Sequence, residues 1–222
     1  MKLHHTLAAL ASMACVGAAQ GMTVFSDDFD DADGTVLDGK AADVGGPWSE
    51  NTGVTVNGGI LDTSGAGRTA FADFTAALGP GEIITVTYDA AESAGNFSSG
   101  FAGVSLFIGG AEEVFIGNPG SIDNWGIDGG TIGGTQDAGQ TAEDLTAVFT
   151  YAYDSGDWTF DLSSGESLSG TGVSGQGFNR LRIGNGEGGD LAVDSLVVEI
   201  VPEPSSLALL GLGGLAVLRR RR

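Results

Sequence analysis

The sequence of 222 residues predicts an all-β protein, a two-sheet antiparallel β-sandwich of the jelly-roll type. Short apolar segments alternate with period two, which is typical of strands with one buried face. Turns rich in glycine separate these segments, and glycine supplies 39 residues of the chain. Between Met22 and Val201, no segment of about ten or more residues shows the 3.6-residue period of an amphipathic helix. We expect helices only as flanks, an N-terminal signal helix and a short C-terminal hydrophobic helix.

The chain begins with a segment, residues 1–21, that has the features of a secretory signal peptide. Lys2 precedes an apolar stretch at residues 6–17, and small residues follow it. The residues that offer cleavage positions are Ala18, Ala19 and Gly21. Cleavage there would remove Cys15, the single cysteine, so the mature protein would contain no disulfide.

The domain predicted at residues 22–201 contains roughly eleven to thirteen strands. In the segment 83–89, Ile84, Val86 and Tyr88 share one face and threonines share the other. The segments 145–153 and 158–162 alternate in the same way, so each has one buried face. The segment 104–108 is apolar at nearly every position, which predicts a strand covered on both sides.

The last 21 residues, 202–222, have three parts in order. A proline-rich motif ends the last strand, and an apolar run of 12 residues at 207–218 is shorter than the roughly 20 residues that span a bilayer. Four arginines then close the chain and favour the cytoplasmic side of a membrane. The residues of the motif and of the basic cluster are Pro202, Glu203, Pro204, Arg219, Arg220, Arg221 and Arg222.

This C-terminal segment resembles the tripartite PEP-CTERM sorting signal of Gram-negative bacteria. The resemblance implies recognition by an exosortase near Pro202-Glu203-Pro204, transient anchoring in the inner membrane and removal of the tail. It also implies delivery to the cell surface or to an extracellular polysaccharide matrix. The resemblance predicts where the protein goes and leaves its activity open.

Charge and composition exclude several classes of function. Residues 22–201 contain 28 acidic and four basic residues, a formal net charge of −24. Nucleic acid and anionic membrane surfaces repel such a charge, so we expect neither as a partner. Cleavage of the signal peptide would also remove both histidines, and with them Ser-His-Asp or Cys-His catalysis and His/Cys zinc sites.

Three segments of the domain resemble the concanavalin A-like (laminin G-like) jelly rolls. They are the opening Phe25-Ser26-Asp27-Asp28-Phe29, the hairpin at 149–162 and the closing strands at 181–196. The resemblance implies the sandwich fold. Members of that superfamily bind glycans, cleave glycans or mediate adhesion, so the fold does not choose among these functions.

Candidate glycan-binding residues lie in two places. Trp125 has polar and glycine neighbours, so we expect it in a loop, where its ring can stack on a sugar while Asp123 and Asn124 bind hydroxyl groups. Arg180 and Arg182 share a face opposite Leu181 and Ile183 and could meet acidic sugars. The alternative for this arginine pair is neutralisation of neighbouring carboxylates.

Calcium is the cofactor that the acidic composition favours, because it binds several oxygen ligands. Asp194 is in phase with Leu196 and Val198, so we expect its carboxylate to point inward and to need a donor or a cation. If the first and last strands pair, Asp28 and Asp30 are the natural co-ligands. Hydrogen bonds from nearby backbone N–H groups to Asp194 are the alternative.

We therefore expect a secreted, surface-sorted, non-catalytic β-sandwich that serves as a matrix or adhesion component and binds extracellular polysaccharide. One alternative is a glycan-active enzyme that uses carboxylates. Asp157 and Asp161 share a strand face, but the Glu-x-Asp-x-x-Glu spacing common in glycosidases of this fold is absent from the sequence. A second alternative is a structural matrix protein without a defined ligand.

Overall fold

The computed structural model describes residues 21–50, 53–63, 67–92, 97 and 100–203. The expected signal helix and C-terminal hydrophobic helix, together with Pro204 and the four terminal arginines, lie outside the described residues. Within them the structure is an all-β sandwich with sixteen strands and one short 3₁₀ helix, η1 (Gly130–Ile132). No helix in this described part is long and apolar enough to span a membrane.

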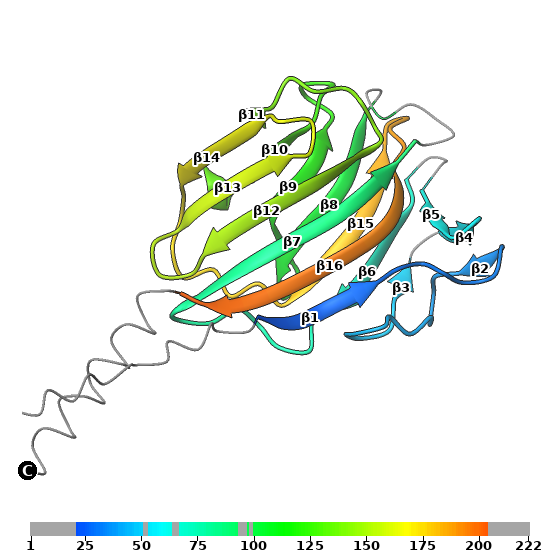
Figure 1. Cartoon of the computed structure of the whole chain (residues 1–222), viewed down its shortest axis with the longest axis horizontal. Coiled ribbons are helices and arrows are strands. Elements are labelled where there is room, and N and C mark those ends of the chain that lie inside the picture. The colour runs from blue at the N-terminus through cyan, green and yellow to red at the C-terminus, as the bar shows by residue number, and fades with distance from the viewer. Residues whose placement is uncertain (1–20, 51–52, 64–66, 93–96, 98–99, 204–222) are drawn as a thin grey trace, which may run out of the picture.

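Two sheets pack face to face (Figure 1). The nine-stranded sheet has the order β14 (Ser167–Thr171), β13 (Asp157–Leu162), β12 (Leu145–Ala152), β7 (Glu82–Ala91), β16 (Ala192–Pro202), β5 (Ile60–Asp62), β4 (Thr55–Asn57) and β2 (Thr35–Val36), with β1 (Met22–Asp27) paired to β16. The seven-stranded sheet has the order β11 (Gln136–Asp137), β10 (Gly126–Asp128), β9 (Ala111–Pro119), β8 (Phe101–Ile108), β15 (Arg180–Gly186), β6 (Thr69–Asp73) and β3 (Ser49–Glu50).

The predicted alternation is confirmed in the central strands. In β7, Ile84, Val86 and Tyr88 are fully buried, and the intervening positions are half-buried. Strand β12 has the same period, and its register pairs Phe149 with Val86. Because both strands place their apolar face on the same side of the sheet, they form a continuous layer against the other sheet.

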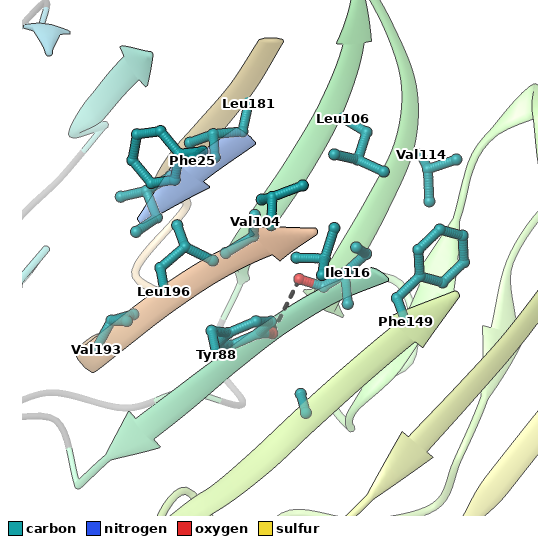
Figure 2. Packing of buried hydrophobic residues seen from close by; sticks show 14 of the residues in the cluster. Phe25, Tyr88, Val104, Leu106, Val114, Ile116, Phe149, Leu181, Val193 and Leu196 are labelled. Carbon is teal, nitrogen blue, oxygen red and sulfur yellow. Dashed lines mark hydrogen bonds between the residues drawn. The ribbon is translucent and has the colours of Figure 1, made fainter. Parts of the chain in front are cut away.

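The core lies between the sheets. Side chains from both sheets meet there, as Figure 2 shows for Leu196 on one side and Val104 and Leu181 on the other. Tyr88 crosses the interface, and its hydroxyl donates a hydrogen bond of 3.1 Å to the Ile116 carbonyl oxygen in β9 (Figure 2). This bond satisfies a buried hydroxyl and links the two layers directly.

Strand β8 is covered on both faces, as its composition predicts. Val104 and Leu106 point into the core, while Ser105 and Phe107 on the opposite face are also buried. The residues that cover this second face come from neighbouring strands of the same sheet. Arg182 of β15 pairs in register with Ser105, and its guanidinium donates to the Ser105 hydroxyl at 3.0 Å. Side chains on the outer face of the seven-stranded sheet therefore pack against one another and form hydrogen bonds across neighbouring strands.

Candidate functional site

The outer face of the seven-stranded sheet carries both arginines of β15. Leu181 and Ile183 point into the core, so the alternation directs Arg180 and Arg182 outward. Arg180 lies over the Phe71 ring, 4.8 Å from its centroid, and Arg182 lies 5.5 Å from that of Phe107. Arginine stacked on an aromatic ring keeps its guanidinium edge available for hydrogen bonds.

Both arginines have carboxylate partners, which is the alternative that the sequence left open. Arg180 Nε lies 3.2 Å from a carboxylate oxygen of Asp73, and Arg182 Nη2 lies 2.8 Å from one of Glu112. The contact between Arg180 Nε and Asp73 has the distance of an ion pair but not the geometry of a hydrogen bond. The Nε atom of Arg182 is likewise buried without a hydrogen-bond partner among the described residues. The arginines thus contribute little net charge, and their Nε atoms are covered by neighbouring protein atoms.

A depression of about 400 Å³ lies beside Arg182 on this face. Its lining consists of Phe101, Glu112, Phe115, Pro119, Asp128, Gly129 and Arg182. The Phe101 and Phe115 rings meet edge to face, with centroids 6.2 Å apart. A lining that combines aromatic rings with a charged pair can contact both the faces of sugar rings and their hydroxyl groups.

Two glycines seat these rings on the sheet. A Cβ atom at Gly103 would lie 2.8 Å from the Phe115 Cζ atom, and one at Gly186 would collide with the Phe101 ring. Only glycine lets each ring approach the backbone so closely. Phe101, Phe115 and Glu112 were missed by the sequence analysis. Alternation along each strand indicates that these side chains face outward. The β8–β9 register, which the sequence does not give, is needed to show that they lie together.

The predicted role of Trp125 at the surface is wrong. Its side chain is fully buried, stacks on Phe97 with centroids 4.5 Å apart, and donates from Nε1 to the Ala142 carbonyl oxygen at 2.7 Å. The segment folds back over the core, so the polar neighbours do not mark an open loop. Asp123 is exposed, and Asn124 donates to the Asp137 carboxylate. Of the five predicted glycan-binding residues, Arg182 lines the depression.

The predicted inward orientation of Asp194 is also wrong. A β-bulge between Val193 and Ser195 inserts an extra residue into β16, so the alternation resets and Asp194 is exposed. The first and last strands do pair, because β1 runs antiparallel to β16. Asp28 and Asp30 are nevertheless exposed, and Asp194 lines a separate depression with Asp89.

The predicted calcium ligands therefore do not converge. Among the described residues, the carboxylates of Asp27, Asp28 and Asp43 come within 4.8 Å of one another, and this group includes neither Asp30 nor Asp194. Asp28 and Asp43 each already accept a backbone N–H, from Asp30 and from Asp28 respectively. The acidic group exists, but it does not fit the ligand set that the sequence predicted.

Asp27 is the buried carboxylate at this end of the sandwich, with 1% of its surface exposed. Lys40 Nζ donates to both of its oxygens at 2.8 Å, and Trp48 Nε1 donates at 2.6 Å. Burial alone lowers the pKa of Lys40, but hydrogen bonds and charges from Asp27 and Asp31 outweigh it and raise the pKa overall. The buried carboxylate of Asp27 is thus paired with the ammonium of Lys40, whereas the sequence predicts a calcium ion bound at Asp194.

Asp157 and Asp161, the acidic pair considered for catalysis, bind the neighbouring strand. Asp157 accepts from the Thr171 hydroxyl at 2.6 Å, and Asp161 accepts from the Ser167 hydroxyl at 2.5 Å. The hydrogen bond from Thr171, with one from Ser155, lowers the pKa of Asp157. A general acid that cleaves glycosidic bonds has a raised pKa, so the shift at Asp157 runs opposite to that role.

The fold is that of lectin-like β-sandwiches. The metal-free exoplasmic/lumenal domain of VIP36 matches with a TM-score of 0.51 and 10% identity, over 83% of this chain and 98% of that chain. A protein described among endo-acting O-glycanases of the human gut microbiota, which initiate mucin breakdown, matches with a TM-score of 0.51 and 12% identity, over 82% of this chain and 100% of that chain. At such identities these likenesses show the fold alone.

The chain carries a PEP-CTERM protein-sorting motif at residues 201–222. This motif defines a secreted, surface-directed protein that an exosortase processes at the membrane. No curated protein sequence matches the chain.

Proposed function

We propose that this protein is a non-catalytic glycan-binding component of the cell surface or of its polysaccharide matrix. The observation that carries the proposal is the depression on the outer face of the seven-stranded sheet, whose lining includes Phe101 and Phe115. Arg182 and Glu112, both in the lining, form an ion pair at 2.8 Å, which puts charged donors and acceptors beside the rings. Such groups can exchange hydrogen bonds with the hydroxyl groups of a sugar whose ring lies on the phenylalanines.

The charge of the site favours an uncharged sugar. Arg180 and Arg182 are each paired with a carboxylate, and Asp128 adds a further negative charge to the lining. The domain as a whole carries a formal charge of −24, which repels anionic polymers. We therefore propose neutral hexose polymers as ligands in preference to the acidic sugars that the arginines alone suggested.

A glycan array followed by calorimetric titration tests this proposal. We expect binding of a neutral polysaccharide, and we expect Phe101→Ala to weaken it about tenfold, a loss of about 1.4 kcal/mol. Phe71→Ala is the matched control, because Phe71 is half-buried on the same sheet face but does not line the depression. Equal loss in both variants, or no binding by the wild-type protein, would contradict the proposal.

Two other functions predict different results. A carboxylate-based glycan-active enzyme would release new reducing ends from a bound polysaccharide, which a reducing-end assay detects. A structural matrix protein without a ligand would give an empty array. The array thus distinguishes a glycan-binding protein from a structural protein without a ligand, and the reducing-end assay distinguishes a glycan-binding protein from an enzyme.

The proposal gives calcium no role in holding the glycan, because Asp28, Asp30 and Asp194 do not form one ligand set. Lys40 already occupies the buried carboxylate of the acidic group. Calorimetric titration with Ca²⁺ tests this directly. Stoichiometric binding that also strengthens glycan affinity would show that calcium belongs in the mechanism.

A further inference from the structure

The end of the last strand enters the sorting motif, and this part of the motif is built into the fold. Strand β16 continues to Pro202, which pairs in register with Glu82 at the start of β7. The backbone N–H of Glu203 then donates to the Gly81 carbonyl oxygen at 2.7 Å. The first two residues of the Pro-Glu-Pro motif are therefore hydrogen-bonded to the domain or paired with it.

A second turn fixes the same residues. The Glu203 carboxylate accepts from the backbone N–H of Asp154, at 3.4 Å, in the turn between β12 and β13. The Asp154 carboxylate in turn accepts from the Gly81 N–H at 3.1 Å. Glu203, Gly81 and Asp154 thus form a closed set of contacts, which we call the motif clamp.

The last strand has partners on both edges as far as Ile200. Ile200 pairs with Ile84 of β7 on one side and with Met22 of β1 on the other. Val201 pairs with Ile83, and a Cβ atom at Gly21 would lie 2.7 Å from its Cγ1 atom. Enzymes that recognise extended peptides need a free backbone edge. Strand β16 offers none as far as Ile200, and from Val201 to Glu203 its edge toward β7 is occupied.

We propose that the folded domain retains Pro202 and Glu203, so that the cut which removes the sorting tail falls on the carboxyl side of Glu203. One peptide bond breaks there. The carbonyl carbon on the domain side gains the hydroxyl of a water molecule, and the departing tail gains the proton and a new amino terminus. Cleavage before Glu203 would require β16 to leave the sheet at its end, against the contacts described above.

Mass spectrometry of the surface form, produced from the full chain in a cell that carries an exosortase, tests the position of the cut. We expect the C-terminal peptide to contain Glu203. A surface form that ends at Val201, at Pro202 or earlier would overturn the proposal. An adduct on the new carboxyl end would show that an amine, in place of water, took the carbonyl carbon, which overturns the hydrolytic step.

Amide hydrogen exchange on the full chain tests the motif clamp independently of any enzyme. We expect the Glu203 amide to be protected and Asp154→Ala to accelerate its exchange about fivefold, the effect of losing one hydrogen bond. Asp157→Ala is the matched control, because it lies on the same hairpin and contacts Thr171 instead. An unprotected Glu203 amide, or equal exchange in the two variants, would overturn the clamp.

Discussion

Asp27 illustrates how a single buried charge is held in this domain. Its carboxylate receives the Lys40 ammonium, the Trp48 indole N–H and the Phe29 backbone N–H. A buried carboxylate is tolerated only when its charge is paired and its oxygens are hydrogen-bonded. Trp48 also packs edge to face on Phe25, with centroids 5.2 Å apart, so the polar group is tied to the core.

Lys40→Met should therefore destabilise the domain strongly. The variant keeps the apolar length of the side chain but leaves Asp27 buried without its cation, which costs about 3 kcal/mol. Urea unfolding of residues 22–203 measures the loss. The double variant Asp27→Asn with Lys40→Met should recover most of it, because no buried charge is then left unpaired and Asp31, which also loses Lys40, is partly exposed to water. Additive losses in the two single variants and the double variant would contradict this coupling.

Alkaline pH should weaken the fold through Tyr88 and Lys40. Burial raises the pKa of Tyr88 well above the usual 10.0, and the pKa of Lys40 is raised above 10.5. Each group loses its proton more easily in the unfolded chain, so its contribution is complete below about pH 10 and is lost as the pH rises further. Urea titrations at pH 8, 10 and 11.5 should show that the free energy of unfolding falls only above about pH 10. Tyr88→Phe should make this fall with pH less steep, by up to about 1.4 kcal/mol per pH unit.

Strand β8 depends on glycine where β9 lies close. A Cβ atom at Gly103 would collide with the Ile116 carbonyl oxygen and press on the Phe115 ring. We predict that Gly103→Ala costs about 2 kcal/mol or more, because backbone atoms cannot move aside cheaply. Gly110→Ala, in the turn that follows β8, meets nothing within 4 Å and should be neutral. Thermal unfolding of both variants checks the contrast, and similar melting temperatures would refute it.

The elements also show how far the sequence predicts the structure. Period-two alternation predicts β7, β12 and β13, because burial of one face imposes that pattern residue by residue. It fails at Asp194, since a bulge shifts the phase without leaving a mark in the composition. It also fails at Trp125, because polar neighbours do not reveal that Phe97 packs on the indole ring. The site is least predictable, since its lining comes from several strands that only the register brings together.

At the scale of the whole molecule, sorting and folding meet at one end of the sandwich. Met22 pairs with Ile200, so the first described strand begins beside the point where the last strand ends (Figure 1). The two ends of the domain, where the predicted signal peptide and the sorting motif adjoin it, therefore lie beside each other. The depression beside Arg182 lies on the other sheet, and not on the sheet whose last strand enters the sorting motif.

The net charge of −24 predicts that salt stabilises the domain. Repulsion among exposed carboxylates is screened over about 10 Å at 0.1 M salt and over about 3 Å at 1 M. We expect the melting temperature to rise by about 5 °C between 10 mM and 0.5 M NaCl. A variant with Asp123→Asn, Asp194→Asn and Glu199→Gln, three exposed positions, should gain less from the same salt because it has less charge to screen.

Calcium and magnesium at equal concentration should raise the melting temperature equally, since the Asp27 carboxylate already binds Lys40. An additional increase with calcium alone would show a specific ion site in place of general screening.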